Sequence, residues 1–269
     1  MIAAYLHTLR ESINRRMALV LIGMGVLMAV ILILVFRVVA LPNGQTVIML
    51  GRQMLGPAEL AVPAAMVQEV QITGGLWLFL AIFASTPLLV SMMEKGWVEL
   101  TLTKGVARWQ VLMGAYFGGL TLYAATLAVA TIPPAIWLWF KTGVGFQSLV
   151  VAILIQVFAF AALMALAALA CMTRTGAAIP IMLAILVDIL SPVLAFRERG
   201  LFQVITSDFW RGLINWIYRI LPKDVEIVGA AQNYIMNHKL GPWWPFWSTG
   251  VFIAAALGLT MWLLHRKSL

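Results

Sequence analysis

Residues 17–36 read MALVLIGMGVLMAVILILVF and contain no charged or hydrogen-bonding side chain. A helix of about twenty apolar residues is long enough to cross the hydrocarbon core of a bilayer. Five further stretches qualify by the same rule, approximately residues 74–93, 110–139, 147–171, 177–195 and 245–264. We therefore expect an all-α integral membrane protein in which six transmembrane helices form a single domain over residues 1–269.

The composition supports this class and excludes a soluble globular protein. Apolar residues make up 63% of the chain and charged residues 10%, with a mean hydropathy of +0.98, whereas soluble proteins have about half and a quarter. The formal net charge of +8 would also suit nucleic acid. However, the charges lie between the apolar runs rather than on one basic face, so we expect membrane lipids as their partners and no nucleic acid.

Two segments outside the spans show helical periodicity. Within residues 1–16, Ile2, Tyr5, Leu6, Leu9 and Ile13 recur at helical spacing, which predicts an amphipathic helix lying in the membrane interface. Residues 38–73 contain turn signals and are expected to form a short structured loop outside the bilayer.

The long segment between the fifth and sixth spans, residues 196–244, is expected to be an external helical insertion. Ser207 and Asp208 suit the start of an amphipathic helix, and Pro222 suits its end. A second short helix should follow, to about Asn237. The insertion would re-enter the membrane or offer a surface to a periplasmic partner.

Orientation rests on the basic residues that flank the spans. Lys and Arg residues total nine on each side of the expected topology. The positive-inside rule gives most weight to short flanks, and Arg15-Arg16 and Arg266-Lys267 then favour both termini in the cytoplasm. We expect a multi-pass protein of the inner, cytoplasmic membrane.

The sequence contains no motif for catalysis or cofactor binding. GxxxxGK[ST], HExxH and GxSxG do not occur, and His7, His238 and His265 are scattered. Cys171 is the only cysteine, so no disulfide can form within the chain. We therefore expect no cofactor and no metal in this chain, which would not be an enzyme by itself.

The loop between the second and third spans, residues 94–114, reads EKGWVELTLTKGVARWQVLMG. Lys104-Gly105 suits the end of a helix over about 94–103, lying parallel to the membrane on the cytoplasmic side. A solvated loop, kept in water by its charges, is the alternative interpretation.

This stretch resembles the ABC type-2 permease family. Members carry a glutamate, a glycine, a second glutamate with leucines, an arginine, and a short apolar pattern ending in glycine at the start of the next span. The corresponding residues here are Glu94, Gly96, Glu99, Leu100, Leu102, Arg108, Val111, Leu112 and Gly114. The family usually has a proline in the gap and a lysine after the final glycine, where this chain has Thr103-Lys104-Gly105 and Ala115.

The resemblance implies the permease subunit of an ATP-driven exporter. A separate ABC ATPase subunit, acting as a dimer, would bind ATP and Mg, and a second permease copy, identical or a close paralogue, would complete the complex. The helix over 94–103 would then be a coupling helix that docks on the ATPase. Its coupling residues would be Glu94, Gly96, Glu99, Leu102 and Arg108.

Asp188 is the carboxylate that stands out within a span. A charge in hydrocarbon is expensive unless it is paired, protonated or facing water, so Asp188 is a candidate functional residue. Alternatively, it reaches the headgroups or binds Arg197 or Arg199. An ion-coupled secondary carrier would need several such groups. A further alternative is an ATP-driven subunit that transports nothing and anchors or energises a periplasmic assembly.

Overall fold

The computed structural model describes residues 2–40, 46–50, 53–91, 107–173 and 176–266. Within these residues, six helical segments are long and apolar enough to cross a membrane. They are α2 (Met17–Val35), α3 (Ala58–Ile72) continued by η1 (Thr73–Trp77) and α4 (Leu78–Ser91), α6 (Arg108–Thr142), α7 (Gln147–Ala170) continued by η2 (Cys171–Thr173), α8 (Ala178–Ala195) and α12 (Trp244–Arg266). The multi-pass architecture expected from hydropathy is therefore present.

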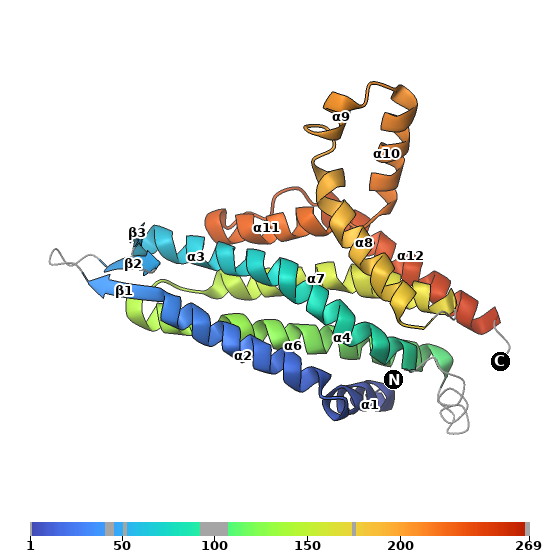
Figure 1. Ribbon diagram of the computed structural model, residues 1–269, viewed down its shortest axis with the longest axis horizontal. Coiled ribbons are helices and arrows are strands. Elements are labelled where there is room, and N and C mark those ends of the chain that lie inside the picture. Colours follow the sequence, from blue (N-terminus) through green and yellow to red (C-terminus); the bar gives the residue numbers. More distant parts are fainter. Residues whose placement is uncertain (1, 41–45, 51–52, 92–106, 174–175, 267–269) are drawn as a thin grey trace.

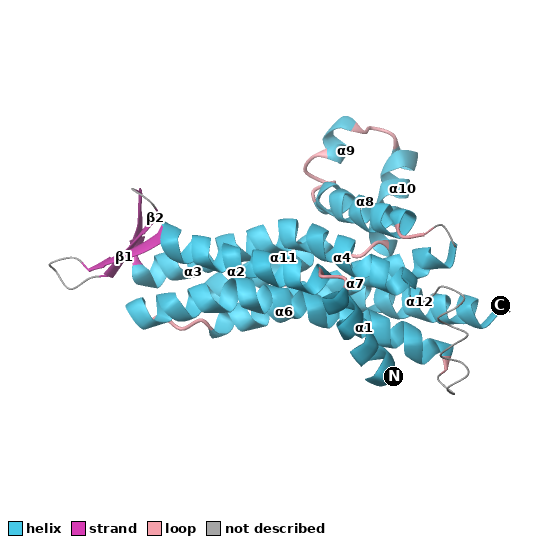
Figure 2. Ribbon diagram, turned by 60° about the horizontal axis from the view of Figure 1, so that its bottom comes forward, coloured by secondary structure: helices cyan, strands magenta, loops and turns pink. Residues whose placement is uncertain are grey.

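The helices form an elongated bundle with two different ends (Figure 1). One end, called the α1 end, carries α1 (Ile2–Asn14), and α4 ends, α6 begins and α12 ends there. The opposite end, called the sheet end, carries an antiparallel sheet of β1 (Phe36–Ala40), β2 (Thr46–Leu50) and β3 (Gln53–Pro57) in the order β1-β2-β3 (Figure 2).

The second span differs from the sequence prediction. Its helical segment begins at Ala58 rather than near residue 74, so the expectation of a loop over 38–73 was wrong for α3. Polar residues such as Glu69 and Gln71 hid this helix from a hydropathy reading. Glu69 is only 4% exposed, because α3 packs inside the bundle rather than against lipid.

Helix α6 extends well beyond the thickness of a membrane. Its 35 residues correspond to about 52 Å at about 1.5 Å per residue, against a hydrocarbon core of about 30 Å. The helix continues through Pro133 and Pro134 and ends at Gly143, whose φ of 74° is in the left-handed region that favours glycine. The helix is therefore longer than one perpendicular crossing of the membrane requires.

Helix α7 is the centre of the bundle, and 16 of its 24 residues are buried. The π-helical turn η1 interrupts the regular α-helical hydrogen bonding of the second span beside it. Gln156 of α7 binds the span at this point, since its Nε2 donates to the carbonyl oxygen of Val70 at 2.7 Å, an oxygen that also accepts from Thr73. Gly74 permits the approach, because a β-carbon there would lie 3.0 Å from the same Nε2.

The segment between the last two spans contains three helices, α9 (Leu201–Val204), α10 (Asp208–Ile220) and α11 (Asp224–Asn237). Helix α10 follows Ser207 and ends before Pro222, as the sequence predicted. It stands away from the bundle (Figure 1) and exposes Phe209, Trp210 and Trp216. Helix α11 instead returns to the bundle and packs against α3 and α7.

Candidate functional site

Most of the predicted coupling residues lie outside the described part of the chain. Glu94, Gly96, Glu99 and Leu102 fall within residues 92–106, whose structure is not described. Arg108 is the first residue of α6. The described residues on both sides of this segment do show what the segment is attached to.

Helix α1 joins the two helices that the segment connects. At the end of α4, the Ser91 hydroxyl donates a hydrogen bond to Oε1 of Glu11 at 3.0 Å. At the start of α6, a β-carbon on Gly114 would lie 2.6 Å from Cβ of Ala4 and 2.8 Å from the main-chain nitrogen of Tyr5. The Tyr5 hydroxyl also donates to Thr121 Oγ1 at 3.2 Å. We call the arrangement of α1, the end of α4 and the start of α6 the clamp.

The clamp uses the small side chains of α1 rather than its large apolar ones. Ala4, Thr8 and Ser12 are buried, whereas Ile2 is 73% exposed and Leu6 is 52% exposed. Gly114 and Gly118 of α6 thus serve packing within one subunit. The exposed apolar face of α1 suits contact with lipid at the membrane interface.

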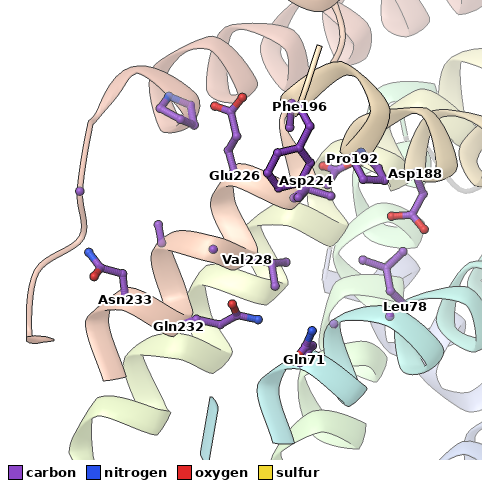
Figure 3. Close-up of a pocket in the computed structure, with 18 of the residues that line it drawn as sticks. Gln71, Leu78, Asp188, Pro192, Phe196, Asp224, Glu226, Val228, Gln232 and Asn233 are labelled. Carbon is purple, nitrogen blue, oxygen red and sulfur yellow. The ribbon is translucent and has the colours of Figure 1, made fainter. Parts of the chain in front are cut away.

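Asp188 lines a cavity of about 800 Å³ on the side of the bundle where α8 and α11 meet. The walls come from η1 and the adjoining ends of α3 and α4, the second half of α8, α11, and the chain leading into α12. Its polar lining residues are Gln71, Asp188, Asp224, Glu226, Gln232 and Asn233. Figure 3 shows Asp188 and Asp224 on neighbouring walls, from α8 and the start of α11, with Leu78 and Phe196 nearby.

Asp224 is the most unusual residue of this cavity. It is 2% exposed, and neither carboxylate oxygen has a hydrogen-bond partner in the described chain. A carboxylate in the first turn of a helix often accepts hydrogen bonds from the free main-chain N–H groups there. Here side chains of other helices accept them instead, since the N–H of Lys223 donates to Thr249 at 3.1 Å and that of Val225 to Ser191 at 3.3 Å.

Burial raises the pKa of the Asp224 carboxyl well above its ordinary value, and the negative charge of nearby Asp188 raises it further. Lys223, the adjacent residue, opposes this shift without forming an ion pair with Asp224. The Lys223 ammonium instead donates to the carbonyl oxygen of Tyr218 at 3.2 Å and lies 4.6 Å from the centre of the Tyr218 ring. The Lys223 ammonium is therefore bound by α10 rather than by Asp224.

The arginines considered as partners of Asp188 are engaged elsewhere or exposed. Arg197 donates to Asn215 at 2.8 Å, stacks on the Tyr218 ring at 3.6 Å and lies 3.6 Å from Glu198. Arg199 is exposed. In the described structure Asp188 forms no hydrogen bond or ion pair, so its surroundings differ from the arginine-paired alternative.

Sequence reasoning identified Asp188 but missed Asp224. In the sequence Asp224 follows Pro222-Lys223 in a segment interpreted as external, where a carboxylate at a helix start is ordinary. Only the packing of α11 against α3 and α7 buries it. No local sequence signal could have shown this.

Within the described ranges, no group of three or more His, Cys, Asp or Glu side chains is arranged to hold a metal ion. The site therefore consists of two neighbouring unpaired carboxylates in a largely apolar cavity, together with the clamp at the α1 end of the bundle. Comparison of the chain with protein-family models and with curated proteins finds no match.

Proposed function

We propose that the chain is the membrane permease subunit of an ATP-driven exporter and that a separate ATPase subunit drives it. Two copies of the permease would form the translocation path, and residues 94–109 would dock on the ATPase at the cytoplasmic side. The α1 end would then be cytoplasmic and the sheet end external.

The clamp is the observation that carries this proposal. A coupling segment needs a stiff connection to the spans that it moves. Residues 92–106 connect α4 to α6, and α1 contacts both of these helices. Contacts at Gly114 involve main-chain atoms of α1, so α1 and α6 cannot slide past each other without separating. Because Glu11 also accepts from Ser91, movement of the segment would displace α1, α4 and α6 together.

The interrupted second span supports the same mechanism. A π-helical turn with two adjacent glycines, Gly74 and Gly75, lies between α3 and α4. Such turns are local weak points in a helix. Motion of α4 at the α1 end could therefore bend the span at η1, beside the cavity, while α3 stays packed on α7 and α11.

The first test is whether a reading frame that adjoins this one in the genome encodes an ATPase with the GxxxxGK[ST] motif, since its absence would count against the proposal. Purified with that ATPase, the parent chain should copurify with it and stimulate its ATP hydrolysis. The double variant Glu94→Lys/Glu99→Lys should lose both properties, because lysines cannot accept the charge-assisted hydrogen bonds that the two carboxylates would accept from the docking surface. The matched control is Glu59→Lys, which reverses an exposed carboxylate in the first turn of α3 at the sheet end. Undiminished copurification and stimulation in the double variant would refute the coupling assignment.

The two carboxylates of the cavity favour a second candidate, an ion-coupled carrier. Asp188 and Asp224 are close enough to interact electrostatically, and neither is paired with a base in the described chain. The two functions differ in their energy source. Transport that stops when the ATPase is inactivated supports the exporter, whereas transport that persists without ATP and stops with a protonophore supports the carrier.

A further inference from the structure

The cavity beside α8 and α11 has the properties of a site for an organic cation. We propose that it binds an amphipathic monocation, an amine or onium group attached to an apolar body, with Asp188 and Asp224 supplying the negative charge. This cation site depends on the proposed function in one respect, that its ligand would be the exported substrate.

Charge is the first argument. Asp188, Asp224 and Glu226 line the cavity, and no lysine, arginine or histidine is among the described lining residues. Glu226 is already engaged, since it accepts a hydrogen bond from the Tyr218 hydroxyl and lies near Lys223. Two carboxylates remain without partners. A cation placed between them would reduce their mutual repulsion and offset the free energy cost of burying their charges.

Asp224 is the second argument, because it is independent of the count of acids. It is almost fully buried, it lines the cavity, and its two oxygens accept no hydrogen bond. The hydroxyls of Ser191 and Thr249 accept the hydrogen bonds of the adjoining main chain, so the carboxylate is not used to begin the helix. Unsatisfied buried polar groups are rare in native proteins, and a ligand donor explains this one.

Size and lining decide between an inorganic and an organic cation. A volume of about 800 Å³ falls in the range of about 300–1,000 Å³ of small-molecule sites. The remaining walls include Leu78, Phe196 and Val228, which suit an apolar body. An inorganic ion would need about six close oxygen ligands, and the described chain offers no cluster of three acidic or histidine ligands.

The experiment compares two probes of nearly equal size and shape but opposite charge, tetraphenylphosphonium and tetraphenylborate. Binding to the purified full chain in lipid nanodiscs is measured by calorimetry, without the ATPase. Tetraphenylphosphonium should bind saturably at one site per chain, and tetraphenylborate should not. Equal behaviour of the two ions would overturn the proposal, since it would indicate partition into lipid or apolar surface alone.

Variants locate the site. Asp188→Asn and Asp224→Asn should each weaken tetraphenylphosphonium binding at least tenfold, while Glu198→Gln, an exposed carboxylate outside the cavity, should leave it unchanged. Parent-like affinity in both aspartate variants would overturn the proposal.

A variant that keeps both carboxylates guards against misfolding as an explanation. Gly229 lines the cavity, and a β-carbon there meets nothing within 4 Å. Gly229→Leu should therefore fold and block binding, whereas Gly258→Leu, equally unhindered but on α12, should bind normally. Unaltered binding in Gly229→Leu would place the probe elsewhere and refute the site. If binding depends on the aspartates but the chain neither copurifies with the ATPase nor stimulates it, the cation site stands and the exporter function is refuted.

Discussion

Replacing Gly114 by alanine tests the clamp through a single methyl group. The new β-carbon would lie 2.6 Å from Cβ of Ala4 and 2.8 Å from the main-chain nitrogen of Tyr5. Carbon atoms in contact are ordinarily about 3.5–4.0 Å apart. Since one of the two neighbours is backbone, a rotamer change cannot relieve the overlap, and α1 must move away from α6 by about 1 Å.

The expected loss of stability is about 1–3 kcal/mol, the usual range for overpacking. Alanine also favours a helix by roughly 0.5–1 kcal/mol over glycine, so the reference is Gly23→Ala in α2, where the new β-carbon meets nothing within 4 Å. The assay is unfolding in mixed detergent micelles, followed by circular dichroism. The free energy of unfolding of Gly114→Ala should be lower than that of Gly23→Ala by about 1–3 kcal/mol, the cost of overpacking.

A double-mutant cycle makes the assignment specific. Ala4→Gly removes the β-carbon at 2.6 Å and leaves the main-chain nitrogen of Tyr5 and the carbonyl carbon of Ala4, at 2.8 and 2.9 Å, in place, so it should restore only part of the loss in Gly114→Ala. A coupling energy of about 0.5–3 kcal/mol is expected for residues in contact. Equal stability of Gly114→Ala and Gly23→Ala, or a coupling energy of zero, would refute the packing of α1 on α6.

Three further predictions use the same unfolding assay. Gln156→Leu should lose about 0.5–1.5 kcal/mol, because the carbonyl of Val70 loses its hydrogen bond at 2.7 Å and keeps those from the N–H and hydroxyl of Thr73; the exposed Gln147→Leu serves as its control, and equal losses would contradict the role of Gln156. Asp224 has a folded-state pKa raised above its ordinary value of 3.8, so its contribution to stability is fully present below about pH 4 and is lost as the pH rises through the folded-state value. Asp224→Asn should therefore become increasingly more stable than the parent as the pH rises from 4 to 8, and a pH-independent difference would contradict the burial of an ionisable carboxyl. Ser91→Ala should lose about 1 kcal/mol, since it removes the hydroxyl that joins α4 to α1, and no change would show that this hydrogen bond adds nothing to the clamp.

Hydropathy predicted the spans that are long, nearly unbroken apolar runs. The spans around α2, α7, α8 and α12 are of this kind, and their positions match the sequence prediction to within a few residues. Helix α3 was missed because it is less apolar. It is sheltered by other helices, so residues such as Glu69 could be accommodated inside the bundle and lowered the local hydropathy.

The two carboxylates of the cavity also differ in whether the sequence could predict them. Asp188 was found because a carboxylate in an apolar run is conspicuous wherever the run folds. Asp224 was missed because its burial depends on α11 turning back onto α3 and α7, a long-range contact that no local pattern records. The close approach of α1 to Gly114 and Gly118 is likewise a long-range contact that only the structure shows.

The central claim is that residues 94–109 lie on the cytoplasmic side and meet an ATPase. It can be tested by replacing Cys171 with alanine, introducing Glu99→Cys, and labelling with a membrane-impermeant maleimide. We expect labelling in inside-out vesicles, no labelling in right-side-out vesicles, and protection when the partner ATPase is bound. Labelling from the outer side, or labelling that the bound ATPase does not reduce, would contradict it.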